Sequence, residues 1–394
     1  MPLAQRVWCG LTLSLPVSIQ PAFLPAFSPQ ERPSAIIYCE QQFAGLDGKT
    51  AHGLIRHSET FAIKAVIDSQ CAGQDAGLLL DGIAQGIPIV ADLEAALRLP
   101  GPKPHTLIYG MAPADGLYSA ADRRVLLAAL ARGLHLVSGM REYLNDDPAF
   151  ALAARQNKVT IRDVRRPPAL KDLRLFDGSI DSADCLRIAV LGTDGAVGKR
   201  TTATLLVQAL NGAGIHAVLV STGQTGLIQG GRYGIPLDAI PSQYCSGEVE
   251  AAVVQAYRSE SPAVIVIEGQ GALSHPAYLS SGFILRGARP QAVVLQHAPA
   301  RQTLSDFPFL PVPTPASEIR LIEAFALTRV IGLTLNHEGL NDAQLEAAIL
   351  RHQDELSLPV TDPVRCSPQS LVAMVLRAFP QLQPKRQLQP CGVF

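Results

Sequence analysis

A short glycine-rich stretch carries the clearest chemistry in this sequence. Residues 192–203 read GTDGAVGKRTTA, between an apolar run at 186–191 and a helix-like run at 201–210. A glycine turn that joins a strand to a helix and ends in Gly-Lys is the layout of a phosphate-binding loop, because backbone N–H groups and the helix dipole attract anions there. We therefore predict a phosphate site built from Thr193, Asp194, Gly195, Ala196, Val197, Gly198, Lys199, Arg200, Thr201 and Thr202.

The residue after the lysine decides what such a loop can do. Nucleotide hydrolases place a serine or threonine there to hold Mg²⁺, whereas this sequence has Arg200. Arginine cannot ligate a cation, and together with Lys199 it suits a phosphate that is bound and not transferred. Thr201 would serve magnesium only if the loop were shifted by one residue. We therefore expect no metal requirement and predict no metal site.

Two further loops follow strand-like runs and carry candidate catalytic groups. Glu268 ends the apolar run in AVIVIEGQGALSHP, and His275 follows it. The carboxyl ends of strands in open α/β sheets face the ligand, so Glu268 is the first candidate for a general base and His275 the second. In VSTGQTGLIQGG, which we expect to be a loop, Gln224 could stabilise an oxyanion and Thr225 could bind substrate. The alternatives are a loop-capping carboxylate, an ordinary loop histidine and a flexible lid.

Charged residues after two other strand-like runs are candidates for substrate binding. Arg301 follows the run that ends in QHA, and its planar guanidinium suits a substrate carboxylate. Lys49 lies after the first strand-like run, in a polar stretch that could reach a site between two domains. A surface arginine and a simple turn at Asp47-Gly48 are the alternatives at these two places.

The alternation of apolar runs with helical patterns predicts an α/β fold with two parallel-sheet domains, the first Rossmann-like and the second like the P-loop NTPases. The predicted strands are 35–39, 61–68, 87–91, 106–110, 134–139, 158–164, 186–193, 216–222, 263–269, 292–298 and 330–336. The predicted helices are 92–99, 121–133, 147–157, 200–212, 247–259, 317–327, 341–354 and 368–379. The chain then divides into an N-terminal extension (1–35), a Rossmann-like domain (36–165), a linker (166–185), a P-loop-containing domain (186–380) and a tail (381–394).

Composition limits the classes of function. The net charge of −1 provides no basic surplus for nucleic acid or an anionic membrane. The seven cysteines include no C-x-x-C pair, which favours reduced thiols in a cytoplasmic protein. The apolar run at 7–19 resembles a signal peptide, but Pro16 interrupts it and no clean cleavage site follows. We expect a cytoplasmic protein that forms a homo-oligomer, most simply a dimer.

The motifs together resemble a known family. The frame GTD-x-x-VGK and the later EGQG are similar to dethiobiotin synthetase, and the closer resemblance is to bacterial D-glutamate N-acetyltransferases, formerly a family of unknown function. It extends from about residue 36 to about residue 380. The stretches that carry it are DGKTAHGLIRHSE, AVIDSQCAGQDAG, GIPIVADLEAAL, LVSGMREYLNDDP, IRDVRRPP, GTDGAVGKRTT, STGQTGLIQGG, SGEVEAAV and EGQGALSHPAY.

This resemblance implies transfer of acetyl from acetyl-coenzyme A to the amino group of D-glutamate or a related amino acid. Coenzyme A carries phosphates that are bound and not cleaved, in agreement with Arg200. Two alternatives stay open at this point. One is an ATP- and magnesium-dependent ligase or kinase of the dethiobiotin synthetase type, and the other is a regulatory protein that binds a nucleotide without turnover.

Overall fold

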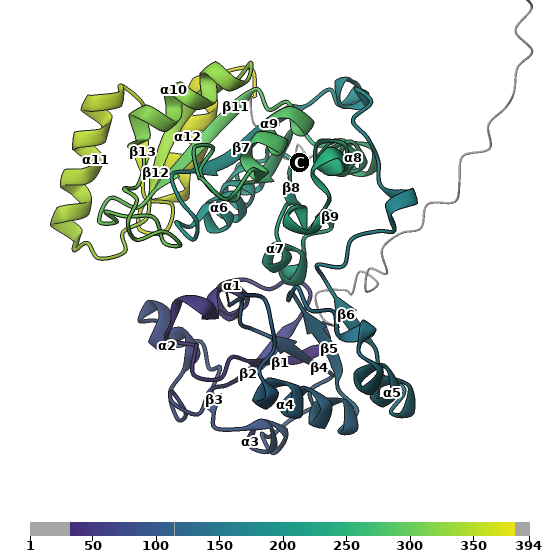
Figure 1. Cartoon of the computed structure of the whole chain (residues 1–394). Coiled ribbons are helices and arrows are strands. Elements are labelled where there is room, and N and C mark those ends of the chain that lie inside the picture. The colour runs from purple at the N-terminus through teal and green to yellow at the C-terminus, as the bar shows by residue number, and fades with distance from the viewer. Residues whose placement is uncertain (1–31, 114, 383–394) are drawn as a thin grey trace, which may run out of the picture.

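The computed structural model describes residues 32–113 and 115–382, which form two α/β domains stacked end to end (Figure 1). The strand order of the first sheet is β3-β2-β1-β4-β5-β6, and that of the second is β13-β12-β11-β7-β10-β8-β9. Neighbouring strands pair in parallel throughout both sheets. The predicted fold class, two parallel-sheet α/β domains, is confirmed.

The first domain has short buried strands with helices on both faces of the sheet. Its strands are β1 (Ser34–Tyr38), β2 (Ala62–Ile67), β3 (Ile89–Val90), β4 (Thr106–Tyr109), β5 (His135–Ser138) and β6 (Ile161–Asp163). Its helices are α1 (Lys49–Arg56), α2 (Ala76–Asp81), α3 (Leu93–Leu97), α4 (Ala120–Ala131) and α5 (Pro148–Gln156). Aspartate or serine side chains cap the amino ends of α2 to α5, which fixes where these helices begin.

The second domain packs two apolar layers against its sheet, one on each face. Its strands are β7 (Leu186–Gly192), β8 (Ala217–Ser221), β9 (Tyr233–Gly234), β10 (Val264–Glu268), β11 (Ala292–His297), β12 (Arg329–Leu335) and β13 (Val360–Thr361). Its helices are α6 (Lys199–Gly212), α7 (Gln224–Gln229), α8 (Ser242–Glu260), α9 (Ser280–Ala288), α10 (Pro315–Phe325), α11 (Asp342–Leu356) and α12 (Pro368–Ala378).

Several elements differ from the sequence-based expectations. Each predicted strand and helix is present, but α8 begins at Ser242, five residues before the predicted 247. Helices α2 and α9 were not predicted, and α1 fills a stretch expected to be mainly loop. The stretch expected to be a glycine-rich loop contains α7. All six residues of α7 are buried, so tertiary packing overrides the weak helix propensity of its glycine.

Helix α7 joins the two domains. Leu227 and Ile228 belong to the second domain by sequence, yet they are buried in the apolar core of the first. The amide Nε2 of Gln229 donates to the backbone oxygens of Gly53 and His57, at 2.6 and 2.8 Å. A shared core and buried hydrogen bonds therefore hold α7 against α1, as Figure 1 shows where the two domains meet.

The predicted linker is fixed to the second domain by two buried carboxylates of α8. Glu248 accepts from the backbone and guanidinium of Arg174. Glu250 accepts from the backbone N–H groups of Asp177 and Ile180, at 2.9 and 3.0 Å. Backbone N–H groups in an irregular segment have no partners in a helix or sheet, and these carboxylates serve as their acceptors.

Glu250→Ala should lower the free energy of unfolding by about 2–3 kcal/mol, because it leaves two backbone donors without an acceptor. Urea denaturation of the whole chain measures this change. The matched control is Glu346→Ala, which removes an exposed glutamate of α11 and should change stability by less than about 0.5 kcal/mol. Equal effects of the two substitutions would contradict the anchoring role of Glu250.

Candidate functional site

The glycine-rich loop forms an open cradle between β7 and α6. Gly198 precedes the helix with a φ of 104°, in the left-handed region that favours glycine. Ala196 also has a positive φ, of 50°. Within the described residues, no side chain caps α6, so the N–H groups of its first turn remain available to an anion. The loop thus has donors that an anion could use, and the phosphate site itself stays a prediction.

Lys199 lies buried across the mouth of this cradle. Its Nζ donates to the backbone oxygen of Asp194. Burial lowers the pKa of Lys199 to about 8, although the charges of Asp194 and Glu268 act in the opposite direction. An anion bound in the cradle would favour the charged form of Lys199 and so raise its pKa.

Arg200 points away from the sheet, toward the first domain. A Cβ atom on Gly53 would lie only 2.5 Å from the Nη2 atom of Arg200, so the guanidinium occupies a notch that only glycine leaves open. Burial lowers the pKa of Arg200, and the nearby charge of Glu268 opposes this shift. The predicted second cation of the cradle thus lies at the domain boundary.

Glu268 ends β10, next to both cations. It is buried, and the Thr222 backbone N–H donates to its Oε2 at 3.3 Å. Burial raises the pKa of Glu268, whereas the charges of Arg200 and Lys199 act to lower it. The structure therefore brings together three predicted residues, Lys199, Arg200 and Glu268.

Asp194 and Arg301 form a second group, which adjoins Lys199 through the backbone oxygen of Asp194. The fully buried Asp194 carboxylate accepts from Nη1 of Arg301 and from the backbone N–H of Ser305, both at 2.9 Å. The guanidinium also donates to the oxygen of Gly195 and to Glu338. These protein acceptors give Arg301 a role in positioning the loop, and its binding of a substrate carboxylate stays a prediction.

His275 packs beside this group. Its ring stacks on Tyr278 at 4.4 Å between centroids, and its Nδ1 accepts from the Ala277 backbone at 3.2 Å. That bond places the proton on Nε2, which lies 4.0 Å from Oδ1 of Asp194 and has no hydrogen-bond partner among the described residues. Burial also lowers the pKa of His275. The side chain is fully buried, so an incoming amine cannot reach the ring as it stands.

The remaining predicted residues lie around these groups. The side chains of Thr193 and Thr202 bond to His297 and Gln296, so only their backbone can serve the cradle. Thr225 bonds Thr50 across the domain boundary at 3.0 Å, and Gln224 is buried in α7.

Lys49 begins α1. Partial desolvation lowers the pKa of Lys49, even though the residue keeps more than a third of its surface in contact with solvent.

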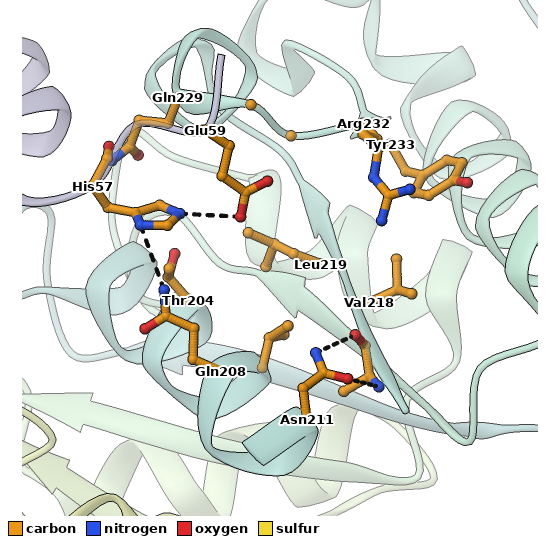
Figure 2. Close-up of a pocket in the computed structure, with 15 residues that line it drawn as sticks. His57, Glu59, Thr204, Gln208, Asn211, Val218, Leu219, Gln229, Arg232 and Tyr233 are labelled. Carbon is orange, nitrogen blue, oxygen red and sulfur yellow. Dashed lines mark hydrogen bonds and ion pairs between the residues drawn. The ribbon is translucent and has the colours of Figure 1, made fainter. Parts of the chain in front are cut away.

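A groove beside α6 was missed by sequence reasoning. Two neighbouring hollows of about 150 and 100 Å³ share His57, Thr204, Gln208 and Gln229. Figure 2 shows that side chains of α6, of β8 and of the turn after α1 converge on the larger one. The sequence signal was the stretch RHSE at 56–59, which has no established functional spacing.

The described residues contain no group of three histidine, cysteine, aspartate or glutamate side chains placed to hold a metal ion. Five cysteines fall in this part of the chain, and all are unpaired thiols. None of its helices combines the length and apolar character needed to cross a membrane. The predicted extension and tail lie largely outside the described residues.

Arg301→Ala should lower the free energy of unfolding of the ligand-free protein by about 3 kcal/mol, since it leaves the buried Asp194 without its cation. Thermal or urea denaturation measures the loss. The control is Arg320→Ala on α10, where the arginine is exposed and a change below about 0.5 kcal/mol is expected. If Arg301 served only to bind a ligand, its removal would leave the stability of the ligand-free protein unchanged.

Comparison with known proteins places these domains in a family. Residues 69–167 match a family model described as a Rossmann-like domain of unknown function (DUF1611_N), and residues 174–372 match the corresponding P-loop domain (DUF1611_C). A protein of Tritonibacter scottomollicae named D-glutamate N-acetyltransferase is 30% identical over 267 residues, which is 66% of this chain and 78% of that protein. A protein of the same name from Pseudoalteromonas sp. is 27% identical over 68% of this chain and 80% of its own length.

A solved structure agrees over a longer part of the chain. The crystal structure of a DUF1611 family protein from Anabaena variabilis ATCC 29413 is 33% identical and superposes with a TM-score of 0.81. The match covers 88% of this chain and all of that one. The chain therefore belongs to the DUF1611 family, whose members combine a Rossmann-like amino-terminal domain with a P-loop domain.

Proposed function

We propose that this protein transfers the acetyl group of acetyl-coenzyme A to the amino group of D-glutamate or a closely related amino acid. The name shared by two relatives, at 30% and 27% identity, supports N-acetyltransfer. The observation that carries the choice of donor is the pair Lys199 and Arg200 at an uncapped helix start. Such a site suits an anionic group that is bound without being transferred.

Coenzyme A supplies phosphates of the right kind. Its pyrophosphate and 3′-phosphate need N–H donors and positive charge, which the cradle and Lys199 provide. Arg200 adds charge at the side of the cradle that faces the first domain. The thiolate of coenzyme A is a good leaving group, so acetyl transfer to an amine requires no metal. Arg200 also stands where a magnesium-binding hydroxyl would be expected.

The position of Glu268 bears on the reaction step. Glu268 lies among the charges of the cradle, where a phosphate would bind. The arm between the pyrophosphate and the sulfur has as many bonds as four peptide residues, so extended it spans roughly 14 Å. A base at Glu268 would meet the thioester only if coenzyme A folded back on itself. Glu268 is better suited to balance Lys199 and Arg200.

A ligase or kinase that uses ATP and magnesium is the second candidate. It is favoured by one observation, the placement of the Thr201 hydroxyl in the first turn of α6. If the loop acted one residue later, the Thr201 hydroxyl could hold the ion. The two candidates differ in their need for a metal, and a binding experiment can therefore separate them.

Full-length protein should bind coenzyme A in titration calorimetry equally well with and without EDTA, because the site uses charge and N–H donors. ATP should bind more weakly and should not be hydrolysed. Acetyl-coenzyme A with D-glutamate should release free thiol, measured with a thiol reagent, without added metal. Tighter binding of ATP that depends on magnesium, with no thiol release, would replace the transferase by the ligase.

Lys199→Ala should weaken coenzyme A binding by about 1.5–3 kcal/mol, or roughly 10- to 150-fold, the usual range for a charged hydrogen bond. The pH dependence is a second signature. The free lysine loses its proton near pH 8, and a bound phosphate would raise its pKa, so binding takes up a proton above that pH. The affinity of the wild type should therefore fall by up to tenfold for each pH unit above about 8. The variant should lack this slope, and an identical slope in both proteins would remove Lys199 from the site.

A further inference from the structure

The groove beside α6 begins at the first turn of this helix, next to the loop 192–199, whose own residues are not among those that line it. Arg200 and Thr201, in the first turn of α6, line its near end. Thr204, Gln208 and Asn211 continue along the same helix, and Tyr233 lies at the far end of the larger hollow (Figure 2). A molecule with a phosphate in the cradle could therefore extend along α6 between the two domains.

A histidine and a carboxylate face each other in this groove. Nε2 of His57 lies 3.2 Å from Oε1 of Glu59, and Nδ1 lies 3.4 Å from the Gln208 amide Nε2 (Figure 2). The hydrogen bond from His57 lowers the pKa of Glu59, so this group stays an ionised acceptor. The His57 proton must then sit on Nε2, so the Nδ1 lone pair faces α6 and accepts from the Gln208 amide at 3.4 Å.

The second domain holds this histidine in place. Gln229 of α7 donates its amide to the backbone oxygen of His57, and its own backbone oxygen accepts from Glu59 at 2.7 Å. The His57 side chain is 31% exposed, in contrast to the fully buried His275. His57 is therefore held in position, and its side chain stays partly exposed.

The arm of coenzyme A is long enough to reach from the cradle to His57. Gln208 lies eight residues after Arg200 in α6, which is about 12 Å along the axis. The extended arm between the phosphates and the sulfur spans roughly 14 Å. Apolar side chains of the larger hollow, Val207, Val218 and Leu219, could pack against the methylene groups next to the sulfur. A phosphate in the cradle would thus put the thioester near Nδ1 of His57.

We propose that His57, oriented by Glu59, is the general base of the acetyl transfer, and that the groove along α6 holds the arm of coenzyme A. This proposal rests on the proposed function. It assigns the base to the first domain, whereas the sequence favoured Glu268 in the second.

The step balances with the groups present. The ammonium group of the acceptor replaces the Gln208 amide as the donor to Nδ1 of His57, and Nδ1 takes one of its protons. The freed amine then attacks the thioester carbonyl carbon. A C–N bond forms, then the C–S bond breaks and the thiolate of coenzyme A leaves. The nitrogen loses its second proton to solvent, and His57 returns its proton to the thiolate. The products are the N-acetyl amino acid, coenzyme A and one proton.

The test compares variants of the full-length protein with acetyl-coenzyme A and D-glutamate. His57→Ala should lower kcat about 100-fold while coenzyme A binding by calorimetry stays within twofold. Added imidazole should restore part of the rate, which it would not do for a merely structural residue. Glu59→Gln should lower kcat about tenfold. His216→Gln is the matched control, because His216 is an exposed histidine 3.4 Å from Glu260, and it should keep the wild-type rate.

The outcomes separate this proposal from the proposed function. If the wild type transfers no acetyl group to any amino acid, the proposed function itself fails. If the wild type is active and His57→Ala keeps its rate within twofold, the base assignment fails while the function stands. A full loss of rate in Glu268→Gln with coenzyme A binding unchanged, and no loss in His57→Ala, would return the role of base to Glu268.

Discussion

Positive charge buried at the start of α6 is the constraint around which the site is arranged. Burial removes water from the Lys199 ammonium group, and the positive end of the helix dipole repels it. The charged lysine therefore needs nearby acceptors. The backbone oxygen of Asp194 and the carboxylate of Glu268 supply part of that compensation. Asp194 needs a cation in turn, and Arg301 provides it from the loop after β11. These ion pairs and hydrogen bonds thus fix the loop, and a bound phosphate would add a further negative charge next to Lys199.

The first domain takes part in this arrangement without a nucleotide motif of its own. Gly53 of α1 leaves the notch that Arg200 occupies, and α7 fixes α1 by burying Leu227 and Ile228 in the core of the first domain. A shared apolar core disfavours free rotation of the domains. Residues of both domains therefore line the groove beside α6, and their positions relative to the cradle are fixed.

The sequence predicted the repeating elements and the loop well, because strand and helix periodicity and the Gly-Lys motif are local signals. It missed α7, whose helix depends on burial between domains that no local pattern records. For Arg301 and His275 the sequence showed the side chains but not their partners, so it could not place both of them beside Asp194. It overlooked His57, whose nearness to Gln208 depends on contacts between residues 151 positions apart.

In any enzyme that holds coenzyme A by its phosphates, the phosphate-binding site lies far from the place where the acetyl group reacts. The reacting carbonyl lies one extended arm away from the phosphates, so the base cannot be part of the cradle unless the arm bends. An α-helix rises about 1.5 Å per residue, and α6 begins at the cradle, so Gln208 lies about 12 Å along its axis from Arg200. A base supplied there by the opposing domain would face the acceptor only when both domains are joined. On the proposed assignment, the Rossmann-like domain would contribute the base and one wall of the groove.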